Sequence, residues 1–145
     1  MARKVINDAD PLILDSSAIL ALLLEEPGHA GILDRISNAE SVGVGAPTFV
    51  ETAILLSSKL RRDARPQLNE FLRAAEAEFI PMGPEHADAA VDAFLRYGKG
   101  RHPAALNFGD CLTYAVAAVA GVPLLFTGSE FAKTDIGGAS QEPPA

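Results

Sequence analysis

The chain of 145 residues is long enough for one domain that buries roughly two-thirds of the surface of its unfolded chain, so folding requires no disulfide or structural metal. Its 12 basic and 19 acidic side chains give a formal net charge of −7, which argues against nucleic-acid binding through a broad basic surface. The single Cys111 excludes an internal disulfide, and we expect it to be a small buried group in a cytoplasmic protein.

Short apolar runs alternate with segments of helical periodicity along the chain. From the amino end, the predicted elements are strand Leu12–Leu14, helix Ser16–Glu26, helix His29–Ala39, strand Val42–Val44 and helix Pro47–Arg62. They continue with helix Gln67–Glu78, strand Phe79–Met82, helix Pro84–Gly98, helix Asp110–Ala120 and strand Pro123–Thr127. This order predicts an α/β sandwich with a mainly parallel central sheet. We expect a single domain over residues 1–136, with Met1 to about Asp10 as a lead-in and residues 137–145 as a disordered tail.

Two stretches could suggest a signal peptide or a membrane span, but neither has the pattern that such a segment requires. The basic amino terminus is interrupted by Asp8 and Asp10 before any apolar run, which is not typical of a signal peptide. The uncharged run from Cys111 to Ser129 approaches the length of a membrane span, but "AGVP" at Ala120–Pro123 breaks it. We therefore expect a buried helix followed by a buried strand, and no association with a membrane.

Acidic residues stand at the boundaries of the predicted elements. Asp15 follows the first strand, and Glu51 lies in the first turn of the helix after the second strand. Asp110 opens the helix after a basic loop, and Glu130 follows the last strand with Asp135 close behind. Ligand sites in open parallel sheets form beyond the carboxyl ends of the strands, so acids at such boundaries can converge.

Each of these acids also has a purely structural interpretation. Asp15 is a good N-cap residue. The stretches Thr48–Glu51 and Asn107–Asp110 match the capping box, in which an acid in the first turn reaches back to the cap nitrogen. Acids are favoured near helix N-termini in any case. Capping does not require that the acids cluster, however, whereas the apolar sequence around each one should hold it near the core.

A cluster of carboxylates would need a positive charge to relieve its repulsion. Oxygen ligands favour a hard divalent cation, and the sequence offers no Cys and His set for zinc. The three histidines, His29, His86 and His102, share no ligand spacing, and we expect them at the surface. The sequence therefore predicts a site for Mg²⁺ or Mn²⁺.

Three stretches resemble a known family: "LILDSSAILALLLEEPG", "APTFVETAILLSSK" and "HPAALNFGDCLTYAVAAVAGVPLLFTGSEFAKTDI". Together with the order of the acids, they are similar to the PIN-domain ribonucleases, and specifically to the VapC-type toxins of bacterial toxin–antitoxin pairs. The resemblance covers about Leu12–Ile136, and "LNFGDCLTYAVA" is its most specific part. It implies a PIN-like α/β/α fold, an Mg²⁺- or Mn²⁺-dependent endoribonuclease activity on RNA, a homodimer, and inhibition by a VapB-type antitoxin.

By motif position, Asp15, Glu51 and Asp110 match the family's three principal acids. The resemblance assigns the fourth role to Glu130, with Asp135 as a neighbour or helper, because Ser129 stands where many members have aspartate. Ser17 and Thr127 are expected beside the same pocket, where they could orient water or a carboxylate. The implied reaction is hydrolysis of an RNA phosphodiester by a metal-activated water.

The partners expected from the sequence are RNA, the antitoxin and a second copy of the chain. The loop "YGKGRHP" places Lys99, Arg101 and His102 just before Asp110, where they could contact RNA, and "KLRRDAR" at residues 59–65 is a second basic cluster. The segments 16–36 and 47–60 carry more aliphatic residues than one small core needs, which indicates an interface.

Two other classes of protein compete with this interpretation. One is a non-catalytic PIN-like module that binds antitoxin or RNA without cutting. The other is a phosphate-receiver domain, which also gathers acids at strand ends but needs an adjacent acidic pair. "LILDSSA" offers one acid only, which disfavours the receiver.

Overall fold

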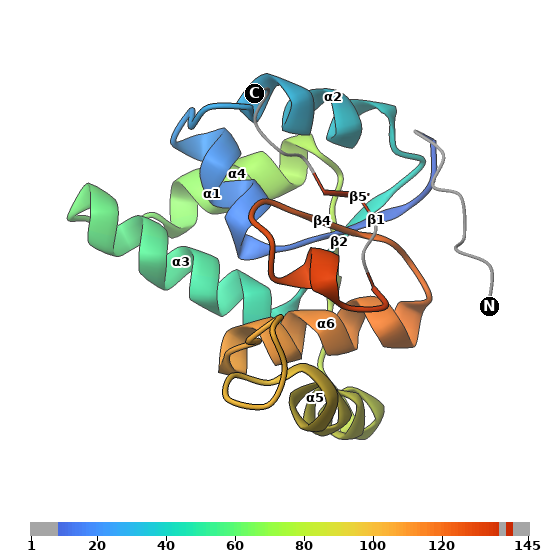
Figure 1. The fold of residues 1–145 in the computed structure, drawn as a ribbon. Helices are drawn as coiled ribbons and strands as arrows, with labels where there is room; N and C mark the ends of the chain where they lie inside the picture. Colours follow the sequence, from blue (N-terminus) through green and yellow to red (C-terminus); the bar gives the residue numbers. More distant parts are fainter. Residues whose placement is uncertain (1–8, 137–138, 141–145) are drawn as a thin grey trace.

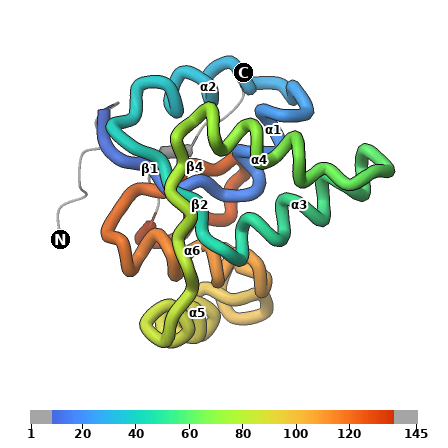
Figure 2. The backbone as a smooth tube through the Cα atoms, turned by 180° about the vertical axis from the view of Figure 1, so that it is seen from behind, coloured from blue at the N-terminus to red at the C-terminus, as the bar shows by residue number. Residues whose placement is uncertain are grey.

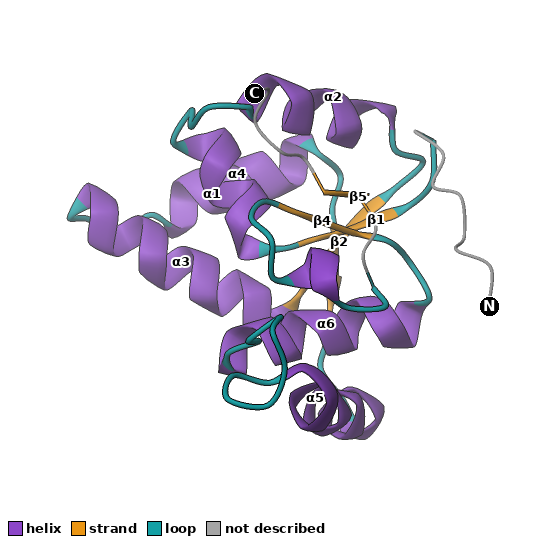
Figure 3. Ribbon diagram, in the orientation of Figure 1, coloured by secondary structure: helices purple, strands orange, loops and turns teal. Residues whose placement is uncertain are grey.

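The computed structural model describes residues 9–136 and 139–140. Its centre is a parallel sheet in the order β3-β2-β1-β4-β5 (Figure 3). The strands are β1 (Leu12–Leu14), β2 (Val42–Gly45), β3 (Glu78–Ile80), β4 (Leu124–Phe126) and β5 (Ala139–Ser140). The mainly parallel α/β sandwich predicted from the sequence is thereby confirmed.

Helices cover both faces of this sheet (Figure 1). One layer consists of α1 (Ser16–Leu23), α2 (His29–Asn38) and α4 (Arg65–Ala74), and the other of α5 (Pro84–Tyr97) and α6 (Phe108–Ala120). Helix α3 (Ala46–Leu60) packs on both α1 and α6. Its far end, with the turn into α4, projects from the body of the molecule (Figure 2). A short 3₁₀ turn, η1 (Phe131–Lys133), follows β4.

The side-chain alternation of the strands explains the two layers. Successive residues of a strand point to opposite faces, so Leu12 and Leu14 enter the core beneath α1, α2 and α4, while Ile13 enters the core beneath α5 and α6. All three are nearly inaccessible to water. Burial of each such side chain contributes roughly 1.5–3 kcal/mol to folding, which is why a strand of three residues suffices at this position.

Glycines in β2 let neighbouring elements approach its carboxyl end closely. A Cβ atom at Gly43 would lie 2.8 Å from Cδ1 of Ile80 and 3.2 Å from Cδ1 of Ile13. A Cβ atom at Gly45 would lie 2.7 Å from Cγ2 of Val116, so α6 rests directly on the backbone where β2 ends. The start of α6 is located by Gly109, which lies against the Glu51 side chain of α3, the helix that begins directly after β2.

Several predicted boundaries shift in the structure. Helix α1 ends at Leu23 rather than Glu26, and α6 begins at Phe108, two residues before its predicted start. Helix α4 covers Arg65–Ala74, with Pro66 in its first turn where the missing N–H is not needed. Within the predicted tail, Ala139–Ser140 pair with β4, while residues 137–138 and 141–145 lie outside the described residues.

The structure also bears on the expectations for Cys111 and for membrane association. Cys111 is buried in the core beneath α5 and α6 and has no disulfide partner, as expected. Within the described part of the chain, none of the helices is long and apolar enough to cross a membrane.

Candidate functional site

Asp15 occupies the junction between β1 and α1. It is the N-cap of α1, and its Oδ2 accepts hydrogen bonds from the backbone N of Ser17 at 3.0 Å and from Oγ of Ser17 at 2.6 Å. Its own N–H donates to the carbonyl of Leu125 in β4 at 2.9 Å. The residue is only 5% exposed, and this burial is the main reason that its pKa is raised. Asp15 is therefore a cap, as one interpretation predicted, and also a buried acid.

Glu51 lies one turn deeper in α3 than the sequence suggested. The helix begins at Ala46 with Gly45 as its N-cap, so Thr48–Glu51 is not a capping box and that interpretation was wrong. Instead, Oε1 of Glu51 accepts a hydrogen bond from Oγ of Ser16 at 2.6 Å. Its Oε2 lies against Gly109, where any Cβ atom would collide with it. Glu51 thus links the beginnings of α1 and α6.

Asp110 lies in the first turn of α6 and forms the capping box expected with Asn107. The backbone N of Asn107 donates to Oδ2 of Asp110 at 3.0 Å, and the backbone N of Asp110 donates to Oδ1 of Asn107 at 2.9 Å. Because α6 follows α5 through a loop, this acid is not at a strand end. Contact between Gly109 and the Glu51 side chain places the start of α6 beside α3.

Electrostatics connects Asp110 with the other predicted acids. Its pKa is raised to about 6, chiefly by burial, against the lowering effect of the Asn107 hydrogen bond. The charges of Asp15, Glu130 and Glu51 raise this pKa further. Three of the predicted acids thus act on the ionisation of the fourth, Asp110. That the four form one site stays a prediction.

Glu130 and Asp135 have different surroundings. Glu130 is exposed and follows the turn at Gly128, whose φ of +86° suits glycine. Asp135 lies apart from the other acids: its Oδ1 accepts a hydrogen bond from the hydroxyl of Tyr114 at 2.5 Å, and Oδ2 lies 3.4 Å from a guanidinium nitrogen of Arg96. Its charge is not among those that raise the pKa of Asp110.

The acids are not arranged as a finished metal centre. In the residues that the structure describes, no three Asp, Glu, His or Cys side chains are grouped so that they could hold a metal ion. Glu51 is turned to Ser16, and Asp110 is turned to the backbone of Asn107. The donors themselves are carboxylate oxygens, which suit Mg²⁺ or Mn²⁺.

Hydroxyl groups complete the site, and several were not found from the sequence. Ser17 lies beside Asp15 as expected, and its Oγ also accepts from the backbone N of Thr127 at 3.0 Å. The side chain of Thr127 was expected to contribute, whereas its contact with Ser17 is made by its backbone N. Ser16 and Thr113 were missed: Oγ of Ser16 donates to Glu51, and the hydroxyl oxygen of Thr113 lies 2.8 Å from that of Thr48.

The basic loop before α6 is tied to α5. Nε of Arg101 donates to the carbonyl of Leu95 at 3.3 Å. Nδ1 of His102 accepts from the backbone N of Ala104 at 3.0 Å, and its ring packs edge-on against Tyr97. Lys99 is exposed. A role of Lys99, Arg101 and His102 in RNA contact stays a prediction.

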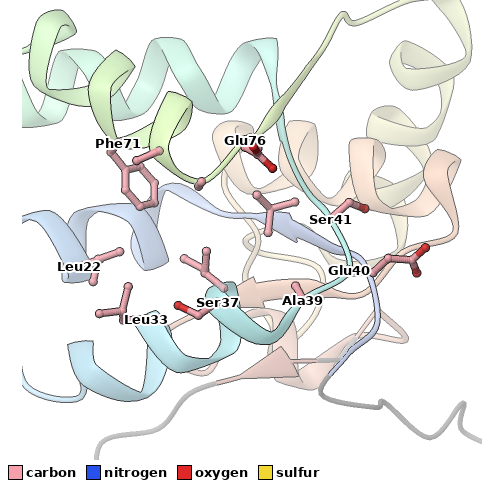
Figure 4. Close-up of a pocket in the computed structure, with 12 residues that line it drawn as sticks. Leu22, Leu33, Ser37, Ala39, Glu40, Ser41, Phe71 and Glu76 are labelled. Carbon is pink, nitrogen blue, oxygen red and sulfur yellow. The ribbon is translucent and has the colours of Figure 1, made fainter.

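Two cavities lie away from the acids. One, of about 510 Å³, opens between α1, α2 and α4 near the amino end of β2, and Figure 4 shows Leu22, Leu33 and Phe71 around it. The other, of about 640 Å³, lies between α5 and the first turns of α6 and is lined mainly by apolar side chains, including Phe94 and Phe108. None of the predicted acids lines either cavity, whereas Lys99 lines the second.

Comparison with known proteins identifies the family to which this chain is similar. The PIN domain family matches residues 12–137. The Ribonuclease VapC of Mycolicibacterium smegmatis is 37% identical over 125 residues, which are 86% of this chain and 97% of that protein. Ribonuclease VapC36 of Mycobacterium tuberculosis is 41% identical over 126 residues, or 86% of this chain and 91% of that protein. A solved toxin–antitoxin complex from Klebsiella pneumoniae shares the fold, with a TM-score of 0.63 at 15% identity over 83% of this chain and 90% of that chain.

Proposed function

Because the chain belongs to the PIN-domain family and, within it, to the VapC ribonucleases, we propose that it is a metal-dependent endoribonuclease toxin that hydrolyses RNA phosphodiester bonds. The observation that carries the proposal is the meeting of Asp15, Glu51 and Asp110 at one edge of the sheet. A buried aspartate beside two further acids is costly without a cation, so this arrangement is better explained by a site than by three separate caps.

Asp15, Glu51, Asp110 and Glu130 would hold Mg²⁺ or Mn²⁺. A bound ion would lower the pKa of a water ligand and neutralise charge on the phosphate. The chain itself supplies the positioning: Ser16 holds Glu51, the backbone of Asn107 holds Asp110, and Ser17 holds Asp15. Gly109 leaves room for the Glu51 carboxylate beside the first turn of α6.

We assign the fourth acidic position to Glu130 rather than to Asp135. The charge of Glu130 raises the pKa of Asp110, which supports its proximity to the site. Asp135 is already engaged by Tyr114 and Arg96 and serves to attach the segment after η1 to α5 and α6. Both acids are exposed, but the Asp135 carboxylate is held by Tyr114 and Arg96 and is less able to move toward an ion than that of Glu130.

The RNA substrate would reach the acids past the loop that carries Lys99, Arg101 and His102. The net charge of −7 rules out a broad electrostatic attraction, so the ion and these few basic residues would supply the contacts with phosphate. Both Lys99 and Arg101 are exposed and belong to the connection that leads directly into α6.

The remaining partners would be a VapB-type antitoxin and a second copy of the chain, in the cytoplasm. The Klebsiella protein of the same fold was solved in a toxin–antitoxin complex. This chain exposes apolar side chains on two helices: Val50, Ile54 and Leu55 on α3, and Val91, Phe94 and Leu95 on α5. An antitoxin bound beside α3 could place a basic side chain among the acids, since Glu51 lies on the same helix.

The alternative is a non-catalytic module with the same fold that binds antitoxin or RNA without cutting. Its supporting observation is that the acids do not yet form a group that could hold a metal, among the residues described. The alternative predicts binding of a structured RNA without cleavage at any metal concentration.

An RNA cleavage assay decides between the two. Purified protein is incubated with a panel of structured RNAs in EDTA, and Mg²⁺ or Mn²⁺ is then added back, beside an Asp110→Asn preparation purified in parallel. We expect cleavage only with the metal and only by the unsubstituted chain. Cleavage that persists in EDTA, or that Asp110→Asn retains in full, would contradict the metal mechanism.

A further inference from the structure

The turn between α3 and α4 carries a basic cluster that the proposed function has not used. Four of the chain's 12 basic side chains fall within residues 59–65, together with one acid, although the chain as a whole has a net charge of −7. This segment, here called the α3–α4 tip, projects from the body of the molecule (Figure 2). Positive charge in this acidic chain is therefore concentrated on a projecting segment.

Most of the charge of the tip is not neutralised within the chain. Arg65 forms an ion pair with Asp63 at 2.8 Å, which accounts for one cation and for the acid. The other three cations are exposed and have no carboxylate partner among the described residues: Lys59, Arg61 and Arg62. One of them, Arg62, donates to the neutral side-chain oxygen of Gln67 at 3.2 Å. An anion could therefore approach these charges without breaking an ion pair.

The backbone of the tip is held in one arrangement. Helix α3 is capped by Arg61, which has a left-handed φ of +54° and whose N–H donates to the carbonyl of Ser57. The hydroxyl of Ser57 accepts from the backbone N of the fully buried Ala64 at 2.9 Å. Glycine or asparagine is the usual residue in such a left-handed cap, so the turn itself does not require an arginine.

One face of α3 connects the tip to the acids. Glu51, Leu55 and Lys59 are four residues apart, so they lie along the same side of the helix. Glu51 is half-buried, Leu55 is 41% exposed and Lys59 is exposed, so this side is open to solvent. At a rise of 1.5 Å per residue, Lys59 lies about 12 Å along the helix from Glu51. A polymer with its reacting phosphate at the acids could follow this face and reach the tip.

We propose that the α3–α4 tip binds phosphates of the RNA substrate at a distance of several nucleotides from the bond that is cut. The inference rests on the proposed function, because RNA enters it as the substrate. RNA carries a phosphate at every nucleotide, and contacts of Lys and Arg with phosphates add affinity without reading the sequence. The tip therefore contributes to substrate binding and leaves the chemical step unchanged.

The test measures kcat and KM, with Mn²⁺, on a long RNA that the unsubstituted chain cuts. The variant Arg61→Gln with Arg62→Gln removes two charges from the tip, and Arg61→Lys with Arg62→Lys keeps both. The control Arg73→Gln removes an exposed charge at the other end of α4. Because these side chains are exposed, we expect all variants to fold, which thermal melts check.

The double Gln variant should raise KM by roughly tenfold at low salt with kcat unchanged, since it loses binding that the ground state and the transition state share. The double Lys variant and Arg73→Gln should stay within about twofold of the unsubstituted chain. Salt gives a second readout: each lost phosphate contact should reduce the slope of log(kcat/KM) against log salt concentration by about 0.7 to 0.9. A purely structural effect of the substitutions would not reduce this slope.

Three results would overturn the inference while the proposed function stands. An unchanged KM and salt slope in the double Gln variant would exclude the tip from the RNA contacts. An equal effect per charge in Arg73→Gln would show that net charge matters and the tip does not. An unchanged KM together with lost binding of a poly-glutamate peptide would assign the tip to an acidic protein partner.

Failure of the proposed function gives a different result. If the unsubstituted chain binds RNA without cutting it, the proposed function fails, and the RNA dissociation constants of the same variants still test the tip. If the unsubstituted chain binds no RNA, the inference fails as well.

Discussion

At the scale of single residues, Asp110 combines two functions that sequence reasoning treated as alternatives. It closes the capping box with Asn107, and its ionisation is influenced by three other acids. A cap needs only a hydrogen-bond acceptor, which asparagine also provides. The negative charge is therefore the property that an Asn substitution isolates.

We expect Asp110→Asn to abolish RNA cleavage while leaving the metal-free protein at least as stable as before. The substitution keeps an acceptor for the backbone N of Asn107 and removes repulsion from Asp15, Glu51 and Glu130. Mn²⁺ at about ten times its dissociation constant should stabilise the unsubstituted chain by roughly 1.4 kcal/mol, or about 2 to 4 °C, and should stabilise Asp110→Asn much less. Paired thermal melts with and without Mn²⁺ measure this. An equal metal response in both proteins would remove Asp110 from the metal site.

Asp110 also predicts a pH dependence of stability in the absence of metal. Its pKa is raised to about 6, so between about pH 4 and 6 the folded chain keeps a proton that the unfolded chain has released. The folded state binds more protons in this range, so the stability from this group is full below about pH 4 and is lost as pH rises through about 6. We expect the melting temperature in EDTA, measured relative to Asp110→Asn, to fall from pH 4 to pH 7. A difference that does not vary with pH would contradict the raised pKa.

At the scale of secondary-structure elements, the site depends on how closely α6 approaches α3 and β2. Gly45 lets Val116 rest on the end of β2, and Gly109 leaves space for the Glu51 carboxylate. Glycine in a helix is unfavourable by roughly 0.5–1 kcal/mol relative to alanine, so Gly109 in the first turn of α6 needs another reason. Contact with Glu51 supplies that reason.

We expect Gly109→Ala to separate stability from activity. Alanine favours the helix, but its Cβ would collide with Oε2 of Glu51, which must then swing away from Ser16. Because the displaced group is the end of a flexible side chain, stability should change by less than about 1 kcal/mol. Cleavage should fall by roughly tenfold or more, since a metal-ligating side chain is misplaced. Melting curves and a cleavage rate test this prediction. Full activity in Gly109→Ala would show that cleavage does not depend on the position of the Glu51 carboxylate.

At the scale of the whole molecule, the packing of a single chain does not explain why apolar side chains are exposed on α3 and α5. Val91 and Leu95 are 58% and 52% exposed on α5, one turn apart. Phe108 at the start of α6, which lines the same cavity as Val91, is 80% exposed. Apolar side chains that gather in this way usually mark an interface, which supports the proposed homodimer.

We expect light scattering to give a mass near twice the 15.2 kDa of one chain at micromolar concentration. The double substitution Val91→Glu and Leu95→Glu should give a monomer, because two charges would be buried without partners in the interface. The control, Gln67→Glu with Asn69→Asp on α4, adds the same charge without removing apolar surface and should remain a dimer. A monomeric unsubstituted chain would contradict the homodimer, and a dimeric α5 variant would exclude α5 from it.

Much of this protein could be inferred from local sequence. Apolar runs such as Leu12–Leu14 have few alternatives to a buried strand, and helix starts at Asp15 and Asn107 carry their own capping residues. The parallel α/β order followed from their alternation. The convergence of Asp15, Glu51 and Asp110 followed from their positions at element boundaries together with the family resemblance.

The contacts between distant segments were decided by tertiary packing alone. The start of α3 was misplaced because Thr48 resembles a cap, whereas Gly45 ends β2 and begins the helix at once. Thr113 gave no signal of its own, since its hydroxyl meets that of Thr48 only when α6 lies against α3. The contacts of Asp135 with Tyr114 and Arg96 likewise join segments far apart in the sequence. Local sequence specifies backbone geometry over a few residues, but a side chain's partners across the core depend on the packing of the whole chain.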